Sequence, residues 1–166
     1  EAKLYVGGKN ITKSDTLKDK LLITYYGKYI KKMIRDLKLE GKVIFTGLLN
    51  EKEMLQQYLK SHVFVCPSSI ENSPNSLGEA MILGVPSVAS YVGGIPDMID
   101  HGKEGFLYQS DASYMLAYYI SEIFKNDNLA LMFSKNARKR ALEIYNVEAN
   151  IESLLEIYYK ILNSDD

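Results

Sequence analysis

Residues 63–90, VFVCPSSIENSPNSLGEAMILGVPSVAS, form the stretch around which the rest of the chain is organised. Residues 63–66 are an unbroken apolar run, which predicts a buried strand. A polar loop with two prolines follows, and apolar residues then recur at helical spacing as far as Gly84 and Pro86, which are typical of a helix end. Residues 87–90 return as a short strand. In such a strand, loop, helix and strand unit, ligands bind at the loop that follows the first strand.

The predicted loop and helix start combine bare amides with two carboxylates. A helix that begins near Asn75 or Ser76 leaves its first backbone N–H groups unpaired, and together with the helix dipole they favour an anion such as phosphate. Glu71 and Glu79 flank this position with seven residues between them. Because a carboxylate repels a phosphate, both side chains are better suited to accept hydrogen bonds from hydroxyls beside the anion, such as those of a sugar.

Each carboxylate also has a purely structural interpretation. Residues 76–79, SLGE, fit the capping box, in which Glu79 reaches back to a backbone N–H at the helix start. Glu71 in a polar loop is by default a solvated side chain. Asn75 is an ordinary N-cap residue, and Pro74 stiffens the approach to the helix. The pattern leaves a capping role and a binding role open for Glu79.

A wider set of residues resembles a known family. Its parts are Glu71, Glu79-Ala80-Met81, GVPSVAS at residues 84–90 and VGGIP at residues 92–96. This combination is similar to the signature of the retaining glycosyltransferase family 4, the GT-B-fold "group 1" enzymes, and is far more specific than either glutamate alone. The resemblance covers nearly the whole chain and is sharpest over residues 68–96. One departure is Asn72, where the family often has glycine.

The resemblance implies a role for each part of the site. Glu79 would bind the ribose hydroxyls of a nucleotide diphosphate sugar, and Glu71 would contact hydroxyls of the donor sugar. The donor-sugar site would comprise Glu71, Asn72, Ser73 and Pro74; the diphosphate site Gly8, Asn75, Ser76 and Leu77; the base site Gly47, Leu48 and Leu49. No catalytic residue is assigned. No metal or other cofactor is expected, in agreement with the absence of an Asp-x-Asp pair from the sequence.

Length, composition and charge fit one domain of this kind. The 166 residues are 46% hydrophobic, which suffices for one substantial core and leaves little room for two. A net charge of -1 provides no general field for nucleic acid, and contact with an anionic membrane would need a local patch. The single cysteine, Cys66, lies in the predicted buried strand, which favours a cytoplasmic setting. No apolar run reaches the length of a membrane span.

Two basic segments and a histidine are weaker candidates for functional residues. Lys9, Lys13, Lys18 and Lys20 could steer an anionic donor, but a solvated loop is the favoured interpretation. For the dense cluster at residues 138–140, RKR, a solvated helix face is favoured over contact with acidic lipid. His101 has no partner at ligand spacing, so the sequence predicts a surface turn residue and not a metal ligand.

The remaining sequence alternates strand and helix patterns. Strands are expected at residues 2–6, 43–46 and 106–108, and helices at residues 21–37, 50–59, 97–100, 111–124, 129–142 and 147–162. Asn50 and Asn146 are the expected N-caps of two of these helices, and Tyr58 lies on the apolar side of the helix at residues 50–59. The short connections predict an α/β fold with a mostly parallel sheet, helices on both faces and a helical C-terminus. Residues 1–166 would then be a single Rossmann-like, nucleotide-sugar-binding domain, one half of a GT-B enzyme.

The function implied by the resemblance is that of the C-terminal, donor-binding domain of a retaining glycosyltransferase. Its parent would move a hexose-type sugar to an acceptor hydroxyl in bacterial-type polysaccharide or glycolipid synthesis. The first strand and helix of this domain, with an arginine and a lysine that clamp the diphosphate, and the acceptor-binding domain would lie before Glu1. This piece alone is therefore expected to be inactive. The parent would act in the cytoplasm, where peripheral association with the inner face of the membrane is allowed.

Two other functional classes remain open. A sugar-nucleotide epimerase of the same architecture would release free nucleoside diphosphate and an altered sugar without any acceptor. A non-catalytic binding or scaffolding domain would have no affinity for nucleotides. A dehydrogenase is disfavoured because neither Gly7-Gly8 nor Gly93-Gly94 supplies the three-glycine fingerprint after a strand.

Overall fold

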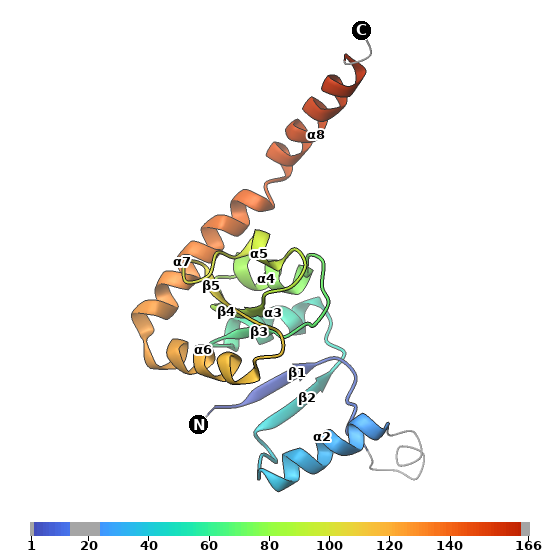
Figure 1. Ribbon diagram of the computed structural model, residues 1–166, viewed down its shortest axis with the longest axis vertical. Coiled ribbons are helices and arrows are strands. Elements are labelled where there is room, and N and C mark those ends of the chain that lie inside the picture. The colour runs from blue at the N-terminus through green and yellow to red at the C-terminus, as the bar shows by residue number, and fades with distance from the viewer. Residues whose placement is uncertain (1, 14–23, 164–166) are drawn as a thin grey trace. The chain divides into compact units, whose positions relative to one another are not determined.

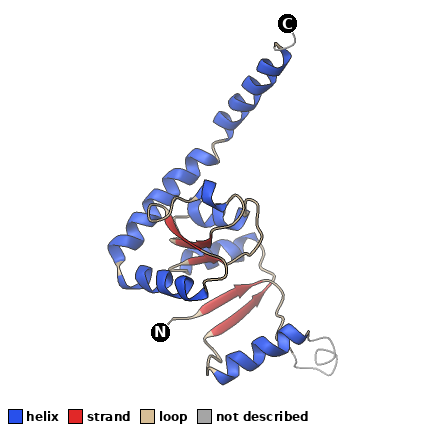
Figure 2. Cartoon of the chain, in the orientation of Figure 1, coloured by secondary structure: helices blue, strands red, loops and turns tan. Residues whose placement is uncertain are grey.

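The computed structural model describes residues 2–13 and 24–163, and the chain divides into two compact units, Glu1–Gln56 and Gln57–Asp166. We call these the first and the second unit (Figures 1 and 2). The strand ladders within the described residues are all parallel and helices alternate with them, which confirms the α/β class. The strands form two separate sheets where one was expected. The predicted helix start at residues 21–23 and the predicted loop positions Lys18 and Lys20 lie outside the described residues.

The first unit contains a two-stranded sheet and a helix. Its elements are β1 (Leu4–Gly7), α2 (Tyr25–Asp36) and β2 (Val43–Gly47), and α3 (Glu51–Lys60) begins in it. Helix α2 starts where the Thr24 hydroxyl accepts a hydrogen bond from the Gly27 backbone N–H at 3.0 Å. Gly27 is the single buried residue among the described residues of this unit. The described residues of this unit therefore form no closed apolar core over the sheet.

The second unit contains a three-stranded sheet, in the order β3-β4-β5, and most of the helices. Its strands are β3 (Phe64–Cys66), β4 (Ser87–Ser90) and β5 (Gly105–Tyr108). Its helices after α3 are α4 (Asn75–Ile82), α5 (Ile95–Met98), α6 (Ser113–Lys125), α7 (Asp127–Ile144) and α8 (Val147–Leu162). Strand β4 and helix α8 coincide with the predicted residues 87–90 and 147–162. The other elements differ from prediction by a few residues at their ends; for example, α5 was expected at residues 97–100 and α7 at residues 129–142.

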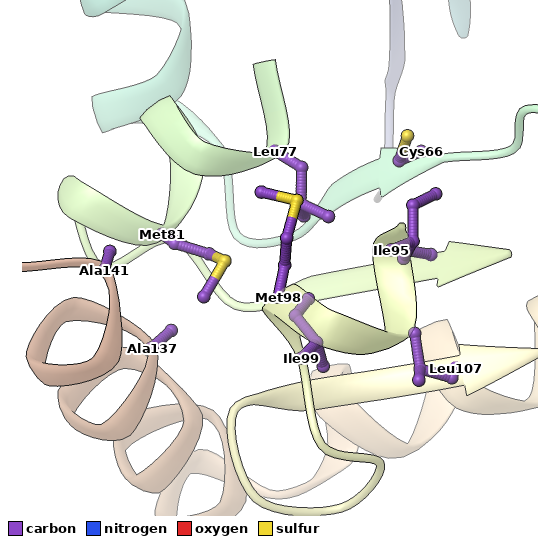
Figure 3. Packing of buried hydrophobic residues seen from close by; sticks show 10 residues of the cluster. Cys66, Leu77, Met81, Ile95, Met98, Ile99, Leu107, Ala137 and Ala141 are labelled. Carbon is purple, nitrogen blue, oxygen red and sulfur yellow. The ribbon is translucent and has the colours of Figure 1, made fainter. Parts of the chain in front are cut away.

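The sheet of the second unit is covered on both faces, as predicted. Alternate residues of β4 and β5 point to opposite faces: Ala89 and Leu107 belong to one buried cluster, Val88 and Tyr108 to another. Figure 3 shows the first cluster, which α4, α5 and α7 complete. Its other members are Cys66, Leu77, Met81, Ile95, Met98, Ile99, Ala137 and Ala141. The second cluster is closed by α6 and by the fully buried Phe133 of α7.

Strand β4 is the most enclosed strand, since all four of its residues are buried. Two of them are serines, and each has a hydrogen-bond acceptor, as a buried hydroxyl requires. Ser87 donates to the Val85 carbonyl at 3.0 Å. Ser90 donates to the Ser68 carbonyl at 2.6 Å, which ties the loop after β3 to the carboxyl end of β4.

The basic cluster at residues 138–140 is not simply a solvated face. Arg138 donates to the Ile82 carbonyl at the end of α4, at 2.8 Å. Arg140 donates to the Asp97 carbonyl at 2.8 Å and pairs with Asp100 at 3.2 Å. Lys103 and Arg140 lower the pKa of the Asp100 carboxyl. Two of the three basic residues therefore attach α7 to the segments around α4 and α5.

Two further predictions are confirmed in the second unit. His101 lies exposed at a turn, where its Nδ1 accepts a hydrogen bond from the Leu107 N–H at 3.1 Å. Asn146 caps α8 by accepting from the Ala149 N–H at 3.0 Å. None of the residues of α8 is buried, and this helix extends away from the sheet of the second unit (Figure 1). Within residues 2–13 and 24–163, no helix has the length and apolar character needed to cross a membrane.

Candidate functional site

The backbone of the loop between β3 and α4 lies against two glycines, Gly93 and Gly94. The Gly94 N–H donates to the Asn72 carbonyl at 2.7 Å. A Cβ atom on Gly93 would collide with the Glu71 carbonyl, and one on Gly94 with the Asn72 carbonyl; Gly93 also has a φ of +52°. The glycines therefore allow the turn after β4 to touch the backbone of the loop. Sequence reasoning used this pair in the family resemblance and in the argument against a dehydrogenase, although glycines after a strand also signal close backbone approach.

Glu71 is held in place by its own loop. The Ser68 hydroxyl donates to one carboxylate oxygen at 3.1 Å, and the Asn72 N–H donates to the other at 3.2 Å. Ser68 is in turn fixed through its carbonyl by Ser90. The carboxylate is half-buried and is not freely solvated. Because a carboxylate has about four lone-pair positions, both oxygens keep capacity for a ligand's hydroxyls.

Helix α4 begins at Asn75 as predicted, and its first amides are bare. Its N-cap is Pro74, which provides no side-chain hydrogen bond, so the interpretation of Asn75 or Ser76 as the N-cap is wrong. The N–H groups of Leu77 and Gly78 both approach the Pro74 carbonyl, at 3.0 and 3.3 Å. Within the described part of the chain, the N–H groups of Asn75 and Ser76 have no acceptor. Such amides, together with the dipole of α4, favour an anion.

Glu79 does not form a capping box. Its Oε2 accepts a hydrogen bond from the Tyr58 hydroxyl at 3.0 Å, and no side chain caps the start of α4. The same hydroxyl lies 3.0 Å from the Ser76 carbonyl oxygen. Tyr58 is only 5% exposed, whereas Glu79 is exposed. The capping interpretation is therefore wrong, and Glu79 lies at the surface with a buried partner beneath it.

A capping box does form at α3, which shows what Glu79 lacks. The Asn50 N–H donates to Glu53 Oε2 at 2.9 Å, and the Glu53 N–H donates to Asn50 Oδ1 at 3.0 Å. Asn50 is the predicted N-cap of this helix. Asparagine at the N-cap with glutamate three residues later gives the reciprocal pair, whereas Ser76 already lies inside α4.

Tyr58 was expected to pack with the apolar side of α3. Its ring does so, with its centroid 5.6 Å from that of Phe64. Its hydroxyl, however, reaches a carboxylate 21 positions later in the chain. Burial and the neighbouring Glu79 raise the pKa of the Tyr58 hydroxyl, which therefore remains a protonated donor. No local sequence pattern links these two residues, so sequence reasoning missed the contact.

The predicted site residues of the first unit form a separate group. Gly8 follows β1 and Gly47 ends β2, and the Gly8 N–H donates to the Gly47 carbonyl at 2.9 Å. Both glycines have positive φ, +102° and +77°, which side-chain-bearing residues rarely adopt. Leu48 is 89% exposed and Leu49 is half-buried. The structure thus brings Gly8 to the predicted base-binding turn.

Two surface hollows lie apart from these residues. One of about 600 Å³ in the first unit is lined mainly by α2 and β2, and one of about 510 Å³ in the second unit is lined by Tyr91, His101, Leu107, Tyr108 and Gln109. Neither hollow is lined by a predicted site residue. Among the described residues there is no group of three or more His, Cys, Asp or Glu that could hold a metal; independence from metal stays a prediction.

Comparison with known families shows to which family the chain belongs. The profile of the family described as "Glycosyl transferases group 1" matches residues 9–140. The chain belongs to this family. It is 28% identical to the N-acetyl-alpha-D-glucosaminyl L-malate synthase of Bacillus anthracis over 136 residues, which cover 82% of this chain and 35% of the relative. It is 32% identical to the poly(ribitol-phosphate) alpha-N-acetylglucosaminyltransferase of Staphylococcus aureus (strain COL), over 78% of this chain and 26% of that enzyme.

Solved structures of group 1 and related glycosyltransferases have the same fold. A mutant of S. aureus TarM, solved in complex with fondaparinux, alpha-GlcNAc-glycerol and UDP, superposes with a TM-score of 0.71 at 27% identity, over 94% of this chain and 29% of TarM. Sucrose-phosphate synthase from Thermosynechococcus elongatus gives a TM-score of 0.76 at 24% identity, over 98% of this chain and 39% of that enzyme. These likenesses confirm the predicted GT-B, Rossmann-like architecture. The chain spans roughly a third of the length of the relatives it matches.

Proposed function

We propose that this chain forms the donor-binding part of a glycosyltransferase that moves a sugar from a nucleotide diphosphate sugar to an acceptor hydroxyl, with retention at the anomeric carbon. The observation that carries the proposal is the pair of bare amides at Asn75 and Ser76, flanked by the held carboxylates of Glu71 and Glu79. The UDP complex of TarM, a relative of 27% identity, supports a nucleotide ligand.

The chemistry of transfer explains why bare amides matter. As the bond between sugar and diphosphate breaks, negative charge accumulates on the leaving diphosphate. Amides at the start of α4 are already oriented by the helix, so they stabilise this charge without reorganising during the reaction. We propose that the bare amides of Asn75 and Ser76 contact the diphosphate in this way, and that Leu77, whose N–H already donates to the Pro74 carbonyl, and the Gly8 turn lie beside it. No metal is required for this role, because the helix start supplies the positive potential.

The carboxylates then recognise the two sugars on either side of the diphosphate. Glu71 accepts hydrogen bonds from hydroxyls of the donor sugar, whose pocket Asn72, Ser73 and Pro74 complete. Glu79 accepts them from the ribose. The turn at Gly47, Leu48 and Leu49 borders the base. Hydrogen bonds to charged acceptors are among the stronger ones in proteins, so both contacts discriminate between hydroxylated and deoxygenated ligands.

The rest of the enzyme is proposed to supply the acceptor site. The matched part of the N-acetyl-alpha-D-glucosaminyl L-malate synthase is 35% of that enzyme, which leaves room for a second domain. We expect the donor-binding chain alone to bind without turnover. A nucleotide sugar is a cytoplasmic metabolite, and the buried free thiol of Cys66 suits a reducing compartment. We therefore propose a cytoplasmic location, with peripheral contact at the inner face of the membrane.

Calorimetric titration with UDP, GDP and ADP, and with their sugar conjugates, tests the proposal. We expect one nucleoside diphosphate to bind, Glu79→Ala to abolish its binding, and Glu71→Ala to remove only the added affinity that the sugar provides. Glu152→Ala, at an exposed position of α8, is the matched control and should bind normally. The titration is made on the full-length enzyme. A wild-type enzyme without nucleotide affinity, or a Glu79→Ala variant with reduced stability and unchanged affinity, would overturn the proposal.

Product analysis on the full-length enzyme separates transfer from epimerisation. Transfer requires an acceptor and yields a glycoside whose anomeric configuration, read by NMR, matches that of the donor. An epimerase would release free nucleoside diphosphate and an altered sugar when no acceptor is present. Acceptor-independent release of that kind would contradict the proposed transferase.

A further inference from the structure

We propose that Tyr58 is a positioning residue of the donor site: it fixes the Glu79 carboxylate toward the ribose, so that the site prefers ribonucleotides to nucleotides without ribose hydroxyls. This inference rests on the proposed role of Glu79 and adds a buried residue that acts through it. Tyr58 comes from the end of α3, 21 positions before its partner, and its hydroxyl oxygen lies 3.0 Å from Glu79 Oε2.

The need for positioning follows from the exposure of Glu79. An exposed glutamate samples many rotamers, and fixing such a side chain costs conformational entropy. A hydrogen bond that holds the carboxylate before the ligand arrives removes part of this cost from binding. Tyr58 suits this task because it is 5% exposed and its ring is packed against Phe64, so it moves little itself.

The hydroxyl of Tyr58 serves two acceptors with one proton. The Ser76 carbonyl and the Glu79 carboxylate both lie at 3.0 Å from it. The charged acceptor attracts the proton more strongly, so the hydroxyl is directed mainly at Glu79, and the Ser76 carbonyl oxygen lies beside it in the first turn of α4. Tyr58 therefore connects Glu79 to the same turn that bears the bare amides of Asn75 and Ser76. The second oxygen, Oε1, remains to accept from a ligand.

Tyr58 can also hold the Glu79 carboxylate in place whether or not a ligand is bound. Within residues 2–13 and 24–163, Glu79 forms no ion pair, so no cation competes for its carboxylate. Burial and the carboxylate itself keep the phenol protonated, because both disfavour the phenolate. A buried phenol needs one acceptor, and the Ser76 carbonyl alone would suffice for it. The contact with Glu79 is therefore more than burial of the hydroxyl requires.

The test compares each nucleoside diphosphate with its 2′,3′-dideoxy form. Titration of the wild-type chain with UDP, GDP and ADP identifies the nucleotide that binds, and its dideoxy form lacks both ribose hydroxyls. Tyr58→Phe keeps the ring and removes the donor. We expect it to weaken binding of the ribonucleotide by about tenfold, the typical effect of losing a hydrogen bond to a charged group, and to leave binding of the dideoxy form unchanged.

Two controls separate positioning from general damage. Tyr119→Phe removes a hydroxyl from a half-buried tyrosine that stacks on Phe106, on the opposite face of the sheet, and should change neither affinity. In the Glu79→Ala background, Tyr58→Phe should have no further effect, because the residue through which it acts is gone. If Tyr58→Phe does not fold, Glu79→Asp withdraws the carboxylate from the hydroxyl at an exposed site and should show the same loss of preference.

The possible results are distinguishable. A wild-type chain that binds none of the nucleotides overturns the proposed function and this inference together. A wild-type chain that prefers the ribonucleotide, with a folded Tyr58→Phe variant that retains the full preference, overturns this inference alone. Equal weakening of both nucleotide forms by Tyr58→Phe indicates a structural role and also overturns it.

Discussion

The two units hold their predicted site residues in different ways. In the second unit, Glu71 and Glu79 are each held by a hydroxyl, and the sheet behind them has buried clusters on both faces. In the first unit, Gly8 and Gly47 end two parallel strands, and Gly27 is the single buried residue among those described. Parallel sheets are normally covered on both faces. The residues predicted to bind sugar and ribose are therefore supported by a closed core, and the residues predicted to bind the base depend on turn geometry.

The largest difference between the two units is expected when they are produced separately. We expect residues 57–166 to fold alone and to unfold cooperatively in urea, because both apolar clusters are contained in them. Residues 1–56 should show no cooperative transition, since a two-stranded sheet without a core is marginal in water. Far-UV circular dichroism of each piece during urea titration measures both. Cooperative unfolding of residues 1–56 would show that the first unit has a core of its own.

Phe133→Ala tests the core of the second unit with a smaller expected effect. Phe133 is fully buried and lies edge-on to Phe106, with centroids 4.9 Å apart at 90°. Its truncation should cost about 3–5 kcal/mol of unfolding free energy. The first-unit control is Tyr25→Ala, at a side chain that is 92% exposed, and should change stability by less than about 0.5 kcal/mol. Urea midpoints at constant m-value compare the two, and similar losses would contradict the difference in burial.

Gly93→Ala sharpens the comparison at the loop itself. The new Cβ meets the Glu71 carbonyl, so the variant should lose more than the about 1–2 kcal/mol that a left-handed backbone costs alanine. Gly102→Ala is the matched control, because Gly102 has a φ of +81° and open space around its Cβ position. Thermal unfolding compares their stabilities, and titration with sugar nucleotide shows whether only Gly93→Ala displaces Glu71. Equal losses of stability in Gly93→Ala and Gly102→Ala would mean that the loop accommodates the new Cβ atom at no additional cost.

The sequence predicts local elements of this fold better than its long-range contacts. Strand β4 and helix α8 have the expected bounds because an apolar run between turn residues and a capped amphipathic pattern are local signals. The division into two sheets had no such signal, since hydrogen bonding between strands depends on residues far apart in the chain. The same limit hid the contact of Gly93 with the Glu71 backbone.

The candidate site shows the same limit at single residues. The bare amides at the start of α4 follow from the position of Pro74 and were predicted. The capping box at residues 76–79 was a reasonable pattern, but the helix begins two residues too early for Ser76 to be its cap. Glu79 instead accepts a hydrogen bond from Tyr58, which lies on another helix. The helical spacing of apolar residues indicates only that Tyr58 faces the core.

Cys66 gives the chain a built-in chemical reporter of loop opening. Its thiol is 5% exposed at the end of β3, and its sulfur lies 3.9 Å from the Ser68 hydroxyl that holds Glu71. Burial raises the pKa of the Cys66 thiol, so the intact loop shields a sulfur that is also poorly ionised. Because the sequence has one cysteine, the rate of modification by a thiol reagent records how often this loop detaches, and protection by a bound nucleotide can be followed without a label.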